Sequence, residues 1–86
     1  MKYYVYILFS ATKDKFYVGS SEDINKRLVR HNAGATPSTK SGRPWKIVYS
    51  EEYDNKSDAI CRELKIKKMK SRKYIEQLIV NGNSAS

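Results

Sequence analysis

Two tyrosines, an arginine and a histidine near the N-terminus have side chains that could act together on a phosphodiester. Tyr6 and Tyr17 lie in two short segments of aromatic and β-branched residues, a composition typical of strands. Arg27 and His31 are four residues apart in the next segment, so on a helix they would lie on one face. A guanidinium can bind a phosphate through two hydrogen bonds, and an imidazole can donate or accept a proton near neutral pH. This set indicates phosphodiester chemistry rather than core packing.

Turn and cap residues divide the chain into the short elements that must position these side chains. The polar connection 10–14 has hairpin length, so the strands on either side of it should pair antiparallel. Strands are predicted at 3–9, 15–20 and 45–53, and helices are predicted after 20–23, from 57 and from 71. The order β-β-α-β-α-α predicts an α/β fold: a small three-stranded antiparallel sheet, with the first strand in the centre, flanked by about three helices. We expect one domain over 1–80, a mobile polar loop at 34–44 and a disordered tail at 81–86.

The charge of the chain is strongly positive and unevenly distributed. The 17 lysines and arginines exceed the 9 acidic residues, which gives a formal net charge of +8, and no acidic residue occurs between 24 and 50. Such a surface attracts a polyanion, and nucleic acid is the commonest one, with DNA the one expected here. No apolar run approaches the roughly 20 residues of a membrane span, and the lone Cys61 cannot form an internal disulfide. We therefore expect a cytoplasmic protein that does not enter a membrane.

Some residues are expected to be structural rather than functional. Cys61 has no second cysteine or suitably placed histidine to work with, so it should be a small buried residue. Trp45, which follows a proline, should anchor the core. In the third strand, alternation predicts Ile47 and Tyr49 on one face of the sheet and Val48 on the other.

The order of these segments resembles the GIY-YIG nuclease superfamily, and in particular its small stand-alone bacterial members, which are similar to the N-terminal domain of an excision-nuclease subunit. The stretch Tyr4-Val5-Tyr6-Ile7-Leu8 resembles the first motif of the family, and Phe16-Tyr17-Val18-Gly19-Ser20 resembles the second. The segment 23–28, followed by His31, is similar to the arginine helix of the family. Glu63, within 59–67, stands where the family has its metal-binding glutamate. The likeness extends over nearly the whole chain, from about residue 3 to residue 78.

The resemblance implies a metal-dependent endonuclease that hydrolyses DNA, either structure-selective or weakly sequence-specific, with a role in DNA repair or recombination. Tyr17, aided by Tyr6, would help to deprotonate the attacking water. Arg27 would stabilise the pentacovalent phosphate, His31 would act beside it, and Glu63 would hold one divalent cation, Mg²⁺ or Mn²⁺. The residues expected to contact substrate are Gly19, Ser20, Lys26, Arg30 and Lys67. Several DNA-cutting relatives have a lysine in place of Ser20, and the larger relatives carry separate recognition domains, so targeting would come from a partner protein or from substrate shape.

Simpler interpretations of the same residues stay open at this point. Tyr6 and Tyr17 could be packing aromatics, His31 a surface residue at a helix end, and Glu63 a partner for Lys67 within one helix. The whole protein could be a nucleic-acid-binding module that keeps the fold without efficient cleavage. If the enzyme interpretation holds, Tyr6, Tyr17, Arg27, His31 and Glu63 should share one face of the fold. The choice between DNA and RNA and the oligomeric state are left open.

Overall fold

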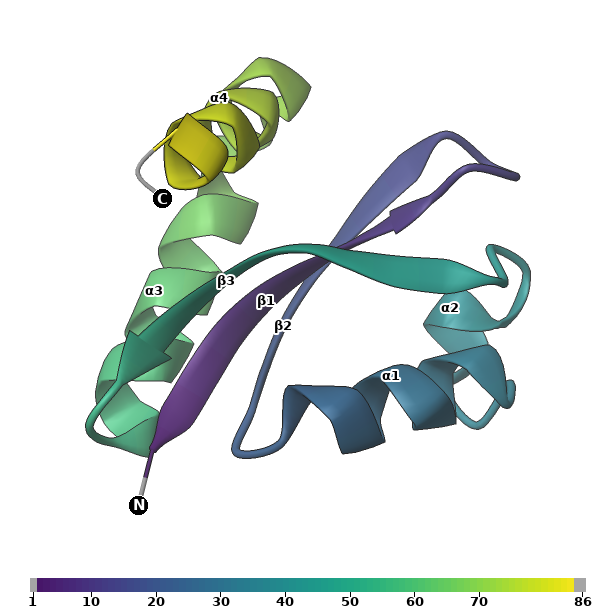
Figure 1. Cartoon of the computed structure of the whole chain (residues 1–86), viewed down its shortest axis with the longest axis horizontal. Helices are drawn as coiled ribbons and strands as arrows, with labels where there is room; N and C mark the ends of the chain where they lie inside the picture. The colour runs from purple at the N-terminus through teal and green to yellow at the C-terminus, as the bar shows by residue number, and fades with distance from the viewer. Residues whose placement is uncertain (1, 85–86) are drawn as a thin grey trace.

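A three-stranded sheet separates two groups of helices in the computed structural model, which describes residues 2–84 (Figure 1). The elements in chain order are β1 (Tyr3–Ser10), β2 (Lys15–Ser21), α1 (Ile24–Asn32), α2 (Pro37–Lys40), β3 (Trp45–Tyr53), α3 (Lys56–Met69) and α4 (Arg72–Ser84). The predicted α/β fold, with three antiparallel strands and the order β-β-α-β-α-α, is confirmed; α2 adds a single turn of helix to it. No helix among residues 2–84 is long and apolar enough to cross a membrane.

The sheet has the strand order β2-β1-β3, with β1 in the centre as predicted. Both neighbours pair with β1 antiparallel, and in the β1–β2 register Tyr6 lies opposite Gly19 while Leu8 lies opposite Tyr17. Four consecutive residues of β1, from Val5 to Leu8, are buried. A continuous apolar run of this kind is typical of a strand that is covered on both faces.

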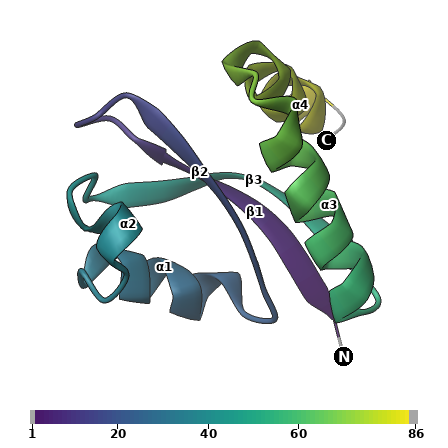
Figure 2. The same cartoon turned by 180° about the vertical axis from the view of Figure 1, so that it is seen from behind.

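Each face of the sheet has its own apolar core. On one face Val5, Ile7 and Val18 pack with Ala59 and Ile66 of α3, and side chains of α4 complete this core. The other core is built on Tyr6, Leu8 and Trp45, with Ile24 and Leu28 of α1 packed against them. Figures 1 and 2 show α1 and α2 on one side of the sheet and α3 and α4 on the other. Trp45 is therefore a core residue, as expected.

A bulge in β3 changes which residues face each core. Ile7 pairs with Tyr49 but the next residue of β1, Leu8, pairs with Ile47, so Val48 is an extra residue between them. Ile47 packs toward α1, whereas Val48 and Tyr49 both pack toward α3 and α4. The prediction that Ile47 and Tyr49 share a face is wrong, because an inserted residue interrupts the alternation of side chains along a strand.

The segment expected to be a mobile loop, 34–44, instead contains α2 and packs against the start of β3. Pro37 occupies the first turn of α2, where its fixed φ suits a helix. Thr39 is fully buried, and its carbonyl accepts a hydrogen bond of 2.6 Å from Trp45 Nε1. Asn32, at the end of α1, receives a 2.6 Å bond from the backbone N–H of Trp45. These contacts hold the segment in place beside α1.

Two further expectations differ from the structure. Cys61 is exposed, because the residues of α3 that pack into the core are Ala59 and Ile66, and position 61 lies outside that buried stripe. Helix α4 begins where Ser71 Oγ accepts a bond from Tyr74 N, and it continues to Ser84. The expected boundary at residue 80 therefore falls inside this helix. Residues 85 and 86 of the expected tail lie outside the described part of the chain.

Candidate active site

A buried chain of hydrogen bonds links β1 to α1 and α2. The hydroxyl of Tyr6, a residue 1% exposed, lies 3.1 Å from His31 Nε2, and His31 Nδ1 lies 2.8 Å from Thr39 Oγ1. The Thr39 hydroxyl also donates to the carbonyl oxygen of Thr36, at 3.2 Å. Because a hydroxyl has one proton and a carbonyl can only accept, Thr39 must accept from His31 Nδ1–H. His31 Nε2 is then a lone-pair acceptor, and Tyr6 donates its phenolic proton to it.

The surroundings of this chain keep both ring systems neutral at rest. Burial lowers the pKa of His31 below its ordinary 6.5, and the positive charges of Arg27 and Arg30 lower it further. Burial raises the pKa of Tyr6, and a hydrogen bond from Arg27 opposes that rise. His31 is therefore uncharged near pH 7, and Tyr6 keeps its proton. The Tyr6 hydroxyl therefore lies between the Arg27 guanidinium and the His31 ring, and it interacts with both.

Local sequence explains how α1 presents these groups. Asp23 is the N-cap of α1, and its carboxylate accepts a 3.0 Å bond from Lys26 N, which fixes where the helix starts. Two turns later His31 is buried at the end of the helix, so the helix end is held against β1. Arg27 is exposed one turn before His31, as their spacing predicted, and Lys26 and Arg30 are exposed beside it.

Tyr17 lies next to this chain on the edge strand β2. Its ring centroid is 5.0 Å from that of His31 and 6.3 Å from that of Trp45. The ring is partly exposed, unlike that of Tyr6, and the amine of Lys67 lies 5.8 Å from its centroid. Tyr17 is thus the phenol that a substrate can reach.

The structure explains why position 19 is a glycine, independently of the predicted contact with substrate. A Cβ atom at this position would lie 2.5 Å from the hydroxyl oxygen of Tyr6, far inside normal contact distance. The Tyr6 phenol therefore crosses β2 at the residue that has no side chain. Contact of Gly19 with substrate stays a prediction.

Glu63 reaches the edge of β2 from the opposite side. Its Oε1 accepts a 2.5 Å bond from the hydroxyl of Ser20, and its Oε2 pairs with Lys67 Nζ at 2.6 Å. Ser20 and Tyr17 point to opposite faces because side chains alternate along a strand. Since β2 is an edge strand, groups on its two faces still meet around its outer side, and Lys67 contacts both Glu63 and the Tyr17 ring.

The expectation that all five groups share one face is therefore wrong. Tyr6, Tyr17 and His31 lie on the α1 face of the sheet, and Glu63 belongs to α3 on the other face. The physical reason is that α3 follows β3 and packs on the face that α1 leaves free. The groups converge at the edge instead, and the negative charge of Glu63 contributes to the raised pKa of Tyr6.

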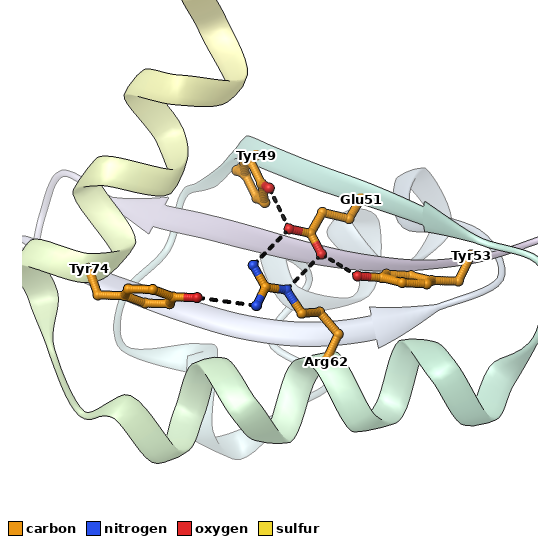
Figure 3. Close-up of polar contacts among 5 residues, drawn as sticks. All are labelled: Tyr49, Glu51, Tyr53, Arg62 and Tyr74. Carbon is orange, nitrogen blue, oxygen red and sulfur yellow. Dashed lines mark hydrogen bonds and ion pairs between the residues drawn. The ribbon is translucent and has the colours of Figure 1, made fainter. Parts of the chain in front are cut away.

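An ion pair that the sequence analysis missed fixes the orientation of α3 (Figure 3). Glu51 on β3 accepts bonds from Arg62 Nε at 2.9 Å, from Tyr53 Oη at 2.6 Å and from Tyr49 Oη. Arg62 also donates to the hydroxyl of Tyr74 on α4, at 3.1 Å. The side chains of Glu51 and Arg62 are 17% and 25% exposed, so the pair is largely shielded from water.

The ion pair has a consequence for the candidate site. Neighbouring residues on a helix point about 100° apart, so holding Arg62 toward β3 turns Glu63 toward β2. The signal in the sequence was the spacing of Tyr49, Glu51 and Tyr53, which puts three polar groups on one side of a strand. That spacing alone does not indicate which residue pairs with the Glu51 carboxylate.

The carboxylate at this site that could bind a metal is that of Glu63. Among residues 2–84, no three histidine, cysteine, aspartate or glutamate side chains gather as a metal-binding cluster. Mg²⁺ is commonly held by one or two carboxylates together with substrate phosphate oxygens and water. Glu63 fits that pattern, and the Lys67 side chain that pairs with it is 44% exposed. The donor set therefore fits a hard divalent cation that arrives with the substrate.

Comparison with known proteins agrees with this geometry. The family model for the GIY-YIG catalytic domain matches residues 2–75. A UPF0213 protein of Staphylococcus saprophyticus is 39% identical over 82 residues, covering 94% of this chain and 98% of that protein. A UPF0213 protein of Syntrophus aciditrophicus is 46% identical over 80 residues, covering 91% and 90%. The solution NMR structure of a UPF0213 protein from Bacillus halodurans superimposes with a TM-score of 0.58 at 31% identity, covering 95% and 87%. The chain therefore belongs to the GIY-YIG catalytic domain family, and its membership implies an endonuclease-type function.

Proposed function

We propose that this protein is a divalent-cation-dependent endonuclease that hydrolyses phosphodiester bonds of DNA. The observation that carries the proposal is the position of three groups at the edge of β2: the partly exposed Tyr17 phenol, the exposed Arg27 guanidinium and the Glu63 carboxylate, whose side chain is 16% exposed. Glu63 is held by Ser20, the Tyr17 ring packs edge-on against His31, and the buried pair of Tyr6 and His31 lies beside them.

The roles follow from exposure and charge. Tyr17 accepts a proton from the attacking water, and the ammonium group of Lys67 lies 5.8 Å from the centre of its ring. The water oxygen then forms a bond to phosphorus as the bond to the leaving oxygen breaks. Arg27 donates to the phosphate oxygens, whose negative charge grows in the transition state, where a preorganised donor is most effective. A divalent cation held by Glu63 would supply further charge stabilisation at the same phosphate.

Tyr6 and His31 act through Arg27 rather than on the substrate. Tyr6 is 1% exposed, and its hydroxyl donates to His31 while receiving a bond from Arg27. We therefore assign Tyr6 and His31 as positioning residues. In this proposal they take no direct part in the chemical step that the family resemblance implied for them. Lys26 and Arg30, exposed on α1, would contact phosphates next to the cleaved one.

One observation favours a second candidate function, a nucleic-acid-binding module with little cleavage. Both carboxylate oxygens of Glu63 are engaged, one by Ser20 and one by Lys67. If Lys67 keeps its place when nucleic acid binds, the ammonium group occupies the position that a cation would need. The protein would then bind a strand and leave it intact.

A cleavage and binding experiment separates the two candidates. Labelled branched, duplex and single-stranded DNA, with RNA counterparts, is incubated with Mg²⁺, with Mn²⁺ and with a chelator. We expect cation-dependent cleavage that Glu63→Gln abolishes, with binding unchanged or slightly tighter because a negative charge beside a phosphate is lost. Glu76→Gln is the matched control, because Glu76 is exposed on α4 and pairs with Arg72. Binding without cleavage under every condition would make the binding module the correct function.

The DNA and RNA arms of that experiment also test the expected substrate. A cytoplasmic location stays a prediction from composition. A role in DNA repair or recombination and a targeting partner protein belong to the proposal and follow from the resemblance to the family. They depend on cleavage being observed first.

A further inference from the structure

A groove of about 430 Å³ runs along the outer side of β2, between that strand and the turn that joins α3 to α4. Tyr17 and Lys67, both at the candidate active site, form part of its wall. The groove therefore opens directly beside the proposed position of the cleaved phosphate. None of the roles assigned above uses it.

The floor of the groove is apolar. It is formed in part by Phe16, Ile66 and Ile75, of which Ile66 is buried and the other two are partly exposed. Cavities of roughly 300 to 1,000 Å³ with mostly apolar walls are typical of sites for small organic groups. A nucleobase is such a group, but a base inside a duplex cannot enter, because its faces and its edge are covered by its neighbours.

The rim of the groove is positively charged. Within residues 2–84 no ion pair joins Lys15 or Lys70 to a carboxylate, whereas Arg72 on the same rim pairs with Asp14 at 2.7 Å. Lys15 and Lys70 are exposed. Two unpaired ammonium groups beside an apolar floor complement a group that is apolar at one end and anionic at the other, as a nucleotide is.

The spacing of these cations matches a strand that leaves the active site. Glu63, Lys67 and Lys70 follow one another at intervals of four and three residues, which is about 10 Å along a helix. Lys15 lies two residues from Tyr17 on β2, about 7 Å along the strand. The rim therefore offers positive charge at successive positions along one direction, away from Glu63.

We propose that the groove binds an unpaired nucleotide segment adjacent to the cleaved phosphate. A base lies on the apolar floor, and the neighbouring phosphates pair with Lys15 and Lys70. The proposal rests on the proposed function only for the position of the cleaved phosphate. It narrows the substrate to single-stranded or locally unpaired nucleic acid, because a fully paired duplex leaves the groove empty.

Equilibrium binding in a chelator tests the groove separately from cleavage. The probes are a blunt DNA duplex, the same duplex with a single-stranded overhang, and the same overhang without bases. We expect the overhang to tighten binding by the wild type, and removal of its bases to weaken that binding by about tenfold, within the range for one stacked base. Lys15→Gln with Lys70→Gln should abolish the gain from the overhang and lower the slope of log affinity against log salt by about 1.4, or 0.7 per lost contact.

Lys56→Gln is the control for the Lys70 substitution, since it removes one positive charge at the first residue of α3, about 20 Å from its C-cap Lys70. It should keep the gain from the overhang. The proposal is overturned if the overhang adds no affinity, if the groove variants behave like the control, or if the overhang without bases binds equally well. It is also overturned if an acidic peptide displaces the labelled overhang as readily as unlabelled overhang does.

The same proteins in Mg²⁺ distinguish the two proposals. Groove-dependent binding of the overhang without any cleavage supports the groove and refutes the endonuclease. Cleavage that does not depend on the overhang or on the two lysines supports the endonuclease and refutes the groove. Circular dichroism of each variant confirms that these exposed substitutions leave the fold intact.

Discussion

Replacing Tyr6 with phenylalanine tests the buried hydrogen bond between Tyr6 and His31. The substitution keeps the ring, so the packing around Leu8 and Trp45 is preserved. It removes the hydroxyl that donates to His31 Nε2, a nitrogen on a residue that is 1% exposed and cannot recruit water easily. A buried polar group left without a partner destabilises a protein by about 1–3 kcal/mol. The free energy of unfolding should fall by about that amount.

The expected change is large enough to measure in a domain of this size. In domains of roughly 60–100 residues, a loss of about 1 kcal/mol lowers the melting temperature by roughly 4–8 °C. Thermal unfolding followed by circular dichroism should therefore show a fall of roughly 4–24 °C for Tyr6→Phe. The control is Tyr4→Phe, because Tyr4 lies on the same strand and its hydroxyl makes no side-chain hydrogen bond among those found in residues 2–84. That variant should unfold close to the wild type.

Cleavage provides a second measurement on the same variant. Without the Tyr6 hydroxyl, Arg27 loses a partner that orients its guanidinium. A displacement of about 1 Å of a catalytic group can lower a rate by about 10²-fold, so kcat should fall by about that factor while the KM changes little. A double-mutant cycle of Tyr6→Phe with His31→Gln should give a coupling energy of about 0.5–3 kcal/mol. Additive effects, or a melting temperature equal to that of Tyr4→Phe, would refute a stabilising hydrogen bond between Tyr6 and His31.

Three further predictions concern pH and close packing. The folded-state pKa of His31 lies below 6.5, so the folded protein binds fewer protons than the unfolded chain, and stability should decrease as the pH falls below 6.5. Denaturant unfolding midpoints of the wild type and of His31→Gln, measured over this pH range, check the prediction. The same dependence of the midpoint on pH in both proteins would contradict it. Burial, and then Glu51, raise the pKa of Tyr49 and Tyr53 to about 12. Their contribution to stability is present below pH 10 and should be lost between pH 10 and 12, with unfolding and tyrosine absorbance moving together; ionisation of all tyrosines near pH 10 without loss of structure would contradict it. Gly19→Ala places a Cβ 2.5 Å from the Tyr6 oxygen and should destabilise by about 1–3 kcal/mol, whereas a wild-type melting temperature would mean that the phenol has room to move.

The fold could be predicted from the sequence where the signals were local. The three strands and the order of the main helices followed from composition, turn residues and caps. Each strand lies within a residue or two of its predicted bounds, and each main helix begins within a residue or two of its predicted start. The faces of β3 could not be predicted, because the bulge at Val48 depends on how β3 pairs with β1, which lies almost forty residues earlier. Helix α2 was missed for a similar reason: its order comes from contacts of Thr39 with His31 and Trp45.

In the candidate site, too, the features that could be predicted were the local ones. The spacing of Tyr6 and Tyr17 across a short hairpin, and of Arg27 and His31 along one helix, are local features, and the structure brings these groups together. The position of Glu63 depends on which face of the sheet α3 covers, and no pattern within α3 specifies that face. The ion pair of Glu51 and Arg62, which sets the rotation of α3, joins β3 to α3. The sequence of neither element indicates that these two side chains meet.

The edge position of the site explains why it needs two separate supports. The α1 side is held by a chain of neutral hydrogen bonds through Tyr6 and His31, and the α3 side is held by the shielded ion pair of Arg62 with Glu51. These supports lie on opposite faces of the sheet, and they meet at β2, where Tyr17 and Ser20 point to opposite sides. A site in the centre of the sheet could not combine them, because neighbouring strands would separate the two faces. In the proposed mechanism, side chains from both layers would reach the same phosphate at the edge strand, and the groove on the outer side of β2 would take the strand that carries it.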